Sequence, residues 1–161
     1  MDNEIRIPIP TDDDGYVLLK CEHCGNFFKV MPSDAQDDRI LYVYCPSCGL
    51  TSESYVTDDV LELVENMTEN IANDLFYEAV KKLEQSNSKN FKVKAGKRPA
   101  HKNENPLHSG VEALETSTFL CCNRTAKIKP LLKMTGAYCP FCGVKNYEVE
   151  KKRSEENPIR F

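Results

Sequence analysis

Two short stretches, Cys21-Glu22-His23-Cys24-Gly25 and Cys45-Pro46-Ser47-Cys48-Gly49, decide the fold of the first third of the chain. Zinc in proteins prefers four soft ligands at the corners of a tetrahedron, and two Cys-x-x-Cys pairs separated by 20 residues supply them when two tight turns approach each other. Each glycine permits the positive φ that such a turn needs. The alternative is a set of free or redox-active cysteines, but no βαβ pattern surrounds the pairs, so the spacing favours zinc.

The residues around these pairs predict strands. Residues 16–19, 27–30 and 40–44 are rich in β-branched and aromatic side chains and lead into or out of the cysteine pairs. The order of strand, turn, strand, strand, turn predicts a small zinc-binding β unit over residues 16–56. Residues 1–15, which include the run Asp12-Asp13-Asp14, are predicted to be a flexible acidic leader.

A second, less regular cysteine cluster follows later in the chain. Tyr138-Cys139-Pro140-Phe141-Cys142-Gly143 nearly repeats residues 44–49, but its mate is the adjacent pair Cys121-Cys122. Aligning Cys122 with Cys24 places Phe119 where Cys21 stands. Cys121 is then expected to be the fourth ligand, although neighbouring side chains of an extended chain point to opposite faces and need a local kink to converge.

Three other possibilities remain open for the second cluster. A three-cysteine site could be completed by His101 or His108, it could be completed by water, or the cluster could hold no metal. A site completed by water is the one opening for zinc catalysis, because catalytic zinc keeps one coordination position free. The predicted ligands of two Zn²⁺ ions are Cys21, Cys24, Cys45, Cys48, Cys121, Cys122, Cys139 and Cys142.

The cysteine turns at residues 21–25, 45–49 and 139–143 resemble those of the zinc-ribbon group, including zinc ribbons of the transcription factor IIB type. The resemblance covers residues 16–56 and 113–150. It implies two zinc ribbons, each a three-stranded antiparallel sheet that holds one zinc. It also implies contact with nucleic acid or with a transcription, translation or repair complex, and no particular reaction.

The region between the clusters predicts one long helix and a linker. Apolar residues recur every three or four positions over residues 57–86, and Thr57 followed by Asp58-Asp59 is typical of a helix start. The wide apolar stripe needs a partner surface, which is either the ribbons of the same chain or the helix of a second copy. Residues 87–112 are polar and basic and predict a linker, and residues 151–161 a charged tail. The fold class is therefore α+β, with two ribbons joined by an amphipathic helix and a basic linker.

Charge divides the chain into an acidic and a basic part. Residues 1–84 hold 18 acids and 6 bases, a net of −12, whereas residues 85–147 hold 3 acids and 11 bases, a net of +8. A basic segment with nearby aromatic side chains predicts contact with nucleic acid, through single strands or shape. The alternative is a protein-docking adaptor of a larger complex, with acids of the same chain covering the cations. The candidate phosphate contacts are Lys92, Lys94, Lys97, Arg98, Arg124, Lys127 and Lys129.

Other functional classes find little support. The sequence contains no phosphate-binding loop, no Gly-rich dinucleotide fingerprint and no His-Glu-x-x-His pattern, so we expect a protein that is not an enzyme, with an open second zinc site as the exception. Residues 1–10 do not resemble a signal peptide, and no apolar run approaches the roughly 20 residues of a membrane span. We expect a cytoplasmic protein without membrane contact, because reduced cysteines are then free to bind metal.

Overall fold

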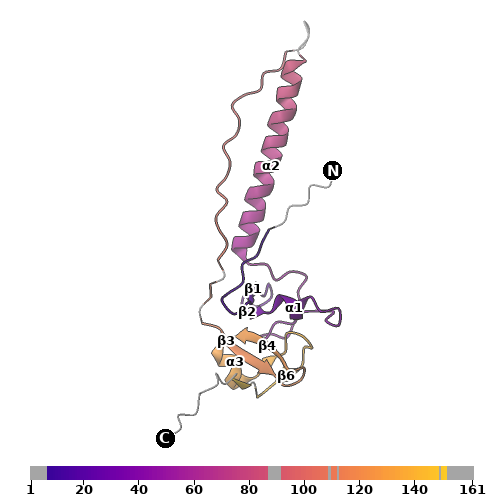
Figure 1. Ribbon diagram of the computed structural model, residues 1–161, viewed down its shortest axis with the longest axis vertical. Coiled ribbons are helices and arrows are strands. Elements are labelled where there is room, and N and C mark those ends of the chain that lie inside the picture. Colours follow the sequence, from indigo (N-terminus) through magenta and orange to yellow (C-terminus); the bar gives the residue numbers. More distant parts are fainter. Residues whose placement is uncertain (1–6, 87–91, 109, 112, 149, 152–161) are drawn as a thin grey trace. The chain divides into compact units, whose positions relative to one another are not determined.

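The protein combines a small antiparallel sheet with one long helix, an α+β arrangement (Figure 1). The computed structural model describes residues 7–86, 92–108, 110–111, 113–148 and 150–151. The chain divides into two compact units. One contains residues 58–107 together with Ile7 and is called the helical arm. The other contains both cysteine clusters and is called the cysteine unit, with a first lobe (residues 8–57) and a second lobe (from residue 108 onward).

Five strands of the cysteine unit form one sheet in the order β1-β2-β4-β3-β7, and every neighbouring pair is antiparallel. The two hairpins are joined edge to edge where β2 pairs with β4, at Lys29↔Lys127 and Val30↔Ala126. The strands are β1 (Val17–Lys20), β2 (Phe27–Val30), β3 (Glu115–Phe119), β4 (Arg124–Ile128) and β7 (Glu150–Lys151); β5 (Ala137–Tyr138) and β6 (Lys145–Asn146) form a separate two-stranded sheet, and the short helices are α1 (Pro32–Ala35) and α3 (Pro130–Thr135).

The third strand predicted at residues 40–44 is reduced to a single bridge, Tyr44↔Thr51. The backbone of this segment bonds to the other lobe instead: the N–H of Tyr44 donates to the carbonyl of Pro140 at 2.8 Å. The predicted pair of separate three-stranded ribbons is thus seen as two hairpins that share one sheet.

The β1–β2 and β3–β4 hairpins of the two lobes repeat each other with an offset of 98 residues, whereas the cysteine turns that follow them are 94 residues apart (139 − 45 = 94). The pair Val17↔Val30 in β1 and β2 is matched by Glu115↔Ile128 in β3 and β4, since 115 − 17 = 98 and 128 − 30 = 98. Lys29 and Lys127, also 98 apart, face each other across the β2–β4 contact. Equivalent residues that pair with each other define a local two-fold relation between the lobes.

Both lobes contribute to one apolar core. Phe28 and Val30 from β2 lie in the same buried cluster as Phe119 from β3 and Ile128 from β4, and all four are at most 2% exposed. Full burial of such a side chain contributes roughly 1.5–3 kcal/mol. A core shared in this way predicts that the lobes fold together.

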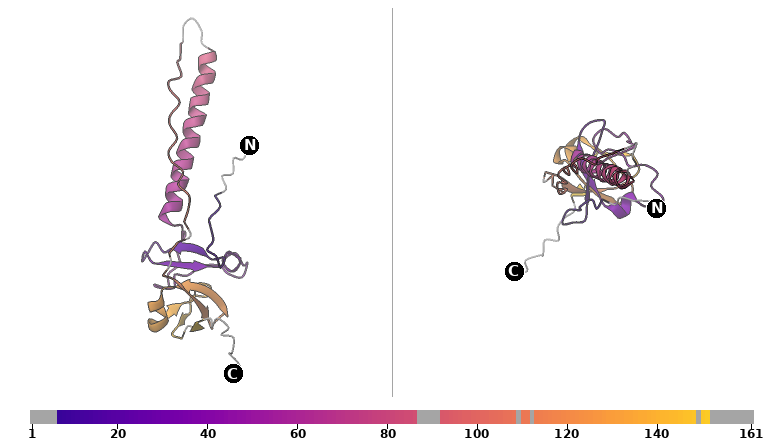
Figure 2. Two further views of the ribbon diagram at one scale, coloured as in Figure 1. Left: turned by 60° about the vertical axis from the view of Figure 1, so that its left-hand side comes forward. Right: turned by 90° about the horizontal axis from the view of Figure 1, so that it is seen from above.

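The helical arm consists of α2 (Asp58–Gln85) and a return segment, residues 92–107, that runs back along the helix (Figures 1 and 2). Buried Asn70 holds the two together: its side chain amide donates to the carbonyl of Lys102 at 3.0 Å and accepts from the N–H of Lys102 at 2.7 Å. The acids Asp58 and Asp59 lie in the first turn of α2, where the helix dipole favours negative charge. Within the described residues, none of the helices has both the length and the apolar character to cross a bilayer.

Candidate metal centres

The first lobe brings four cysteines together. Cys21 and Cys48 have their sulfurs 3.7 Å apart, Cys24 and Cys45 theirs 3.6 Å apart, and all four sulfurs lie within 4.8 Å of one another. Four sulfurs around a zinc ion at about 2.3 Å stand about 3.8 Å apart along the edges of a tetrahedron. The donor type and the spacing therefore fit a tetrahedral metal ion.

Each pair of cysteines in this lobe sits on a tight turn closed by a backbone hydrogen bond. The N–H of Gly25 donates to the carbonyl of Cys21, and that of Gly49 to the carbonyl of Cys45, both at 2.8 Å. The two glycines have φ of +69° and +74°, a region that L-residues adopt at a cost of about 1–2 kcal/mol. His23 is not part of this group, and its Nε2–H donates to the carbonyl of Thr51 at 3.0 Å.

The second lobe also brings four cysteines together, although their spacing along the sequence differs from that in the first lobe. The sulfurs of Cys121 and Cys142 are 3.2 Å apart and those of Cys122 and Cys139 are 3.4 Å apart, and this group also lies within 4.8 Å. Neither His101 nor His108 belongs to the group. The second lobe, like the first, therefore offers four sulfurs that could hold one metal ion.

The kink that lets adjacent cysteines converge comes from the turn itself. Asn123, the equivalent of Gly25 in the 98-residue repeat, has φ of +56°, and its N–H donates to the carbonyl of Phe119 at 2.8 Å. The turn has the same shape as in the first lobe, but the side chain at its first position is Phe119, which is fully buried in the core. Cys121 takes the position that His23 has in the first lobe, since 121 − 98 = 23.

Burial differs among the sulfurs. Cys45 and Cys139 are buried, and burial raises the pKa of both thiols because the thiolate loses its hydration. Cys121 and Cys142 are exposed, and the side chain amide of Asn146 donates to the sulfur of Cys121 at 3.4 Å. A metal ion would displace the protons of the buried thiols, so metal affinity should fall as the pH falls.

The turns at residues 45–49 and 139–143 interlock. The N–H of Tyr44 donates to the carbonyl of Pro140 at 2.8 Å, and the N–H of Tyr138 donates to the carbonyl of Pro46 at 2.9 Å. The rings pack on the opposite glycines: a Cβ built on Gly49 would lie 2.8 Å from the Tyr138 ring, and one on Gly143 would lie 2.9 Å from the Tyr44 ring. The two candidate metal centres are thus joined by direct reciprocal contacts.

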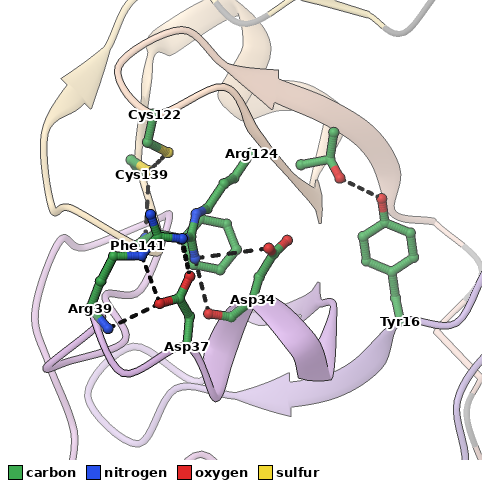
Figure 3. A network of polar contacts seen from close by, with 9 residues as sticks. Tyr16, Asp34, Asp37, Arg39, Cys122, Arg124, Cys139 and Phe141 are labelled. Atoms are coloured by element: carbon green, nitrogen blue, oxygen red, sulfur yellow. Dashed lines mark hydrogen bonds and ion pairs between the residues drawn. The ribbon is translucent and has the colours of Figure 1, made fainter.

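Arg124, a predicted phosphate contact, joins the two lobes (Figure 3). Its guanidinium donates to the carbonyl of Asp34 at 3.1 Å and to the carboxylate of Asp37 at 2.6 Å, and it lies 5.4 Å from the centre of the Phe141 ring. Hydrogen bonds from Arg39 and then from Arg124 hold the pKa of Asp37 well below its usual value. The side chain of Arg124 is only 16% exposed.

Lys127 is held in a similar way. Its Nζ lies 2.8 Å from the carboxylate of Asp12 and 2.5 Å from that of Asp14, and Lys29 binds the same Asp12 at 2.9 Å. Burial alone would raise the pKa of Asp12, but the hydrogen bonds from Lys127 and Lys29 lower it well below its usual value. Asp12 therefore bridges the two equivalent lysines that the β2–β4 pairing brings face to face, and Asp14 adds a second carboxylate at Lys127.

The remaining predicted contacts lie in different places. Lys129 donates to the side chain carbonyl of Asn26 at 2.5 Å. On the return segment, Arg98 pairs with Asp74 of α2 at 2.8 Å, while Lys92, Lys94 and Lys97 are exposed. The carboxylates that hold these cations were missed as site residues. The acidic run at residues 12–14 was the visible signal, but nothing in its sequence identifies the lysines it binds.

Comparisons with protein-family models, with curated proteins and with solved structures found no significant match, so function has to be argued from the residues of the site.

Proposed function

We propose that both cysteine groups hold structural zinc and that the chain is a docking protein without enzymatic activity. Each group offers four sulfurs within 4.8 Å of one another, and tetrahedral all-sulfur sites are typical of zinc or iron. Four protein ligands leave no open position for water, which is what a structural site requires and a catalytic site does not.

The metal assignment is tested by elemental analysis of the purified protein. Two zinc ions per chain are expected, without the visible absorption of a sulfur-bound iron. Replacement of zinc by Co²⁺ should give the absorption of a tetrahedral thiolate complex at both centres. Iron in the purified protein, or one metal ion per chain, would contradict the proposal as stated.

We further propose that the cysteine unit docks on a protein and not on a phosphate backbone. This choice rests on two predicted phosphate contacts of β4, Arg124 and Lys127, which are already engaged by carboxylates of the same chain. Arg124 is bound to Asp37 and Lys127 to Asp12 and Asp14. To meet a phosphate, either cation would have to leave a largely buried carboxylate, which then loses its partner.

An apolar hollow in the first lobe supports docking on a protein. It has a volume of about 400 Å³ and lies between β1, β2, α1 and residues 9–11. Its walls include Val17, Leu19, Val30 and Val43, with exposed Ile9 at the rim. Volumes of this order accept side chains or small ligands in apolar surroundings.

Charge indicates what kind of segment would enter the hollow. Residues 8–57 hold 8 acids and 3 bases, a net of −5, and a bound zinc with four thiolates adds about −2. A partner segment with one large aliphatic or aromatic residue flanked by Lys or Arg would match both the hollow and the charge. The proposed partner is therefore a protein with a basic segment that carries an apolar anchor.

The experiment selects peptides from a random displayed library on the zinc-loaded full-length chain. Enrichment of peptides with an apolar anchor between basic residues is expected, and their binding should be abolished by Ile9→Asp or by Gln36→Trp, which changes an exposed residue lining the hollow. Met134→Asp is the matched control, because Met134 is 85% exposed on α3 of the other lobe. Binding should survive in this control.

Two outcomes would overturn the docking proposal. One is that no peptide is enriched, or that the enriched peptides bind the Ile9→Asp and Gln36→Trp variants unchanged. The other is that the same chain binds a single-stranded oligonucleotide at low salt, with an affinity that falls steeply as salt is added and is lost in Arg124→Glu and Lys127→Glu variants that retain zinc. The second outcome would restore the nucleic-acid interpretation.

A further inference from the structure

The return segment runs along one side of α2 (Figure 2), and the other side carries exposed apolar residues. Its hydrogen bonds and ion pairs with the helix include those of Asn66 and Asn70 to residues 102–104 and those of Asp74 with Arg98 and His101. The opposite side carries large apolar residues that remain exposed, with Phe76 at 72%, Leu83 at 54% and Leu61 at 50%. Such a row along one helix is typical of a surface that binds a partner.

Five exposed positions on the open side of α2 are placed symmetrically about Ala72. Leu61 and Leu83 each lie 11 residues from Ala72 (72 − 61 = 83 − 72), and Thr68 and Phe76 each lie 4 residues from it (72 − 68 = 76 − 72). Eleven residues are about three turns and four are about one turn, so all five positions lie along one side of the helix. Positions placed symmetrically about Ala72 meet in pairs when two copies of the helix cross antiparallel at that residue.

Charge along the helical arm changes sign near the same point. The half that contains residues 58–71 and 99–107 has 6 acids and 1 base, a net of −5, whereas the half that contains residues 72–85 and 92–98 has 3 acids and 6 bases, a net of +3. The hydrogen bonds from Ala95 N–H to the Glu84 carboxylate and from Arg98 to the Asp74 carboxylate place the basic stretch of the return segment beside the second half of α2. Each arm is therefore negative at one end and positive at the other.

We propose that two copies of this chain pair through the open side of α2 in an antiparallel arrangement, with the two-fold axis at Ala72. Leu61 of one copy then packs against Leu83 of the other, and Phe76 packs beside Thr68. The small side chain at Ala72 lets the two helices come close where they cross. This interface goes beyond the proposed docking function, because it uses residues of the arm and none of the cysteine unit.

The direction of pairing follows from the charges. Antiparallel arms place the −5 half of one copy beside the +3 half of the other, twice in the dimer. Parallel arms would place like charges together along their whole length, which is unfavourable. An apolar helix of another protein that is neutral or uniformly charged could pack on the open side of α2. It would lack the attraction between oppositely charged halves that a second copy of the arm provides.

The first experiment measures the molar mass of the zinc-loaded full-length chain over a range of concentrations by sedimentation. A monomer–dimer equilibrium is expected, and Phe76→Glu or Leu83→Glu should weaken dimerisation at least about tenfold, as loss of a central apolar contact does. Leu41→Glu is the control, because Leu41 is 83% exposed but lies in the first lobe. The helical circular dichroism signal of each variant shows whether α2 is intact.

The second experiment tests the orientation with a photo-reactive phenylalanine at position 61. The antiparallel dimer should cross-link to the tryptic peptide that contains Leu83, and added salt should weaken the dimer because it screens the opposed halves. A monomer at every concentration would overturn the proposal, as would a dimer that persists in the Phe76→Glu and Leu83→Glu variants. A cross-link from position 61 to the same region of the second copy would show parallel pairing and would overturn it too.

Discussion

Alanine at Gly49 tests whether the two cysteine turns interlock. Gly49 has φ of +74°, and a Cβ at this position would lie 2.8 Å from the ring of Tyr138, closer than real Cβ contacts come. Gly25 supplies a matched control, because its φ is +69° but a Cβ there would have nothing within 4 Å. The two substitutions therefore share the backbone strain and differ only in the contact with the other lobe.

The expected losses of unfolding free energy follow from the backbone strain and from the contact with the Tyr138 ring. Left-handed strain should cost Gly25→Ala about 1–2 kcal/mol of unfolding free energy. Gly49→Ala should lose the same amount plus about 1–3 kcal/mol for forcing a methyl group against a packed ring. With a urea dependence of about 2 kcal/mol/M, the midpoint of Gly49→Ala should lie about 0.5–1.5 M below that of Gly25→Ala.

The assay is urea unfolding at a fixed excess of zinc, followed by the near-ultraviolet signal of tyrosine. Six of the seven tyrosines lie in residues 8–57 and 108–161, so this signal reports the cysteine unit and is little affected by α2. Gly143→Ala should behave like Gly49→Ala, since its Cβ would meet Tyr44 at 2.9 Å. Equal midpoints for Gly25→Ala and Gly49→Ala would refute the interlocked arrangement.

Three further outcomes are expected. Cys122→Ser should release the second metal ion, whereas Cys121→Ser should weaken metal binding less, because Cys121 is exposed and water can fill its place. Zinc titration with a chromophoric chelator measures the affinity of each variant, and an equal loss of zinc affinity in both would contradict this prediction. Asp12→Asn should destabilise the cysteine unit by about 3–5 kcal/mol at pH 7 in urea unfolding, because two largely buried lysines lose their shared carboxylate. The pKa of Asp12 is lowered in the folded state, so its contribution is present above its unfolded pKa of about 3.9 and is lost as the pH falls; the difference between the native chain and Asp12→Asn should shrink below about pH 4, and a constant difference would contradict this assignment. Arg124→Met should lower the thermal midpoint and raise the pKa of Asp37 in an NMR titration, whereas an unchanged Asp37 pKa would show that Arg39 alone determines it.

The parts of the structure that could be predicted from sequence are local or depend on chemical type. Four sulfurs in Cys-x-x-Cys pairs predict a metal site wherever the turns meet, and an apolar period of three to four residues predicts a helix near residues 57–86, where α2 is found. The positive φ of Gly25 and Gly49 follows from the same turns. These features need only a few neighbouring residues.

The contacts between the lobes could not be predicted in this way. Lys29 and Lys127 are 98 residues apart, Arg124 and Asp37 are 87 apart, and neither sequence period nor composition says which charges will meet. The basic residues of the second lobe therefore suggested a phosphate-binding surface, whereas in the fold Arg124 and Lys127 are bound to carboxylates of the first lobe. A count of charges along the chain does not reveal which of them compensate one another.

The displaced cysteine of the second lobe shows how a core requirement can alter ligand spacing. The first position of the cysteine turn in the first lobe is Cys21, a candidate ligand, but in the second lobe it is Phe119, which is fully buried among residues of both lobes. A cysteine there would remove most of a buried aromatic side chain, a change that costs several kcal/mol in other cores. The fourth sulfur comes instead from Cys121, at the position where the first lobe has the exposed His23, and the tight turn brings this sulfur within 4.8 Å of the other three. The chemistry of the site fixes the number of sulfurs, whereas packing between the lobes decides which position of the turn supplies them.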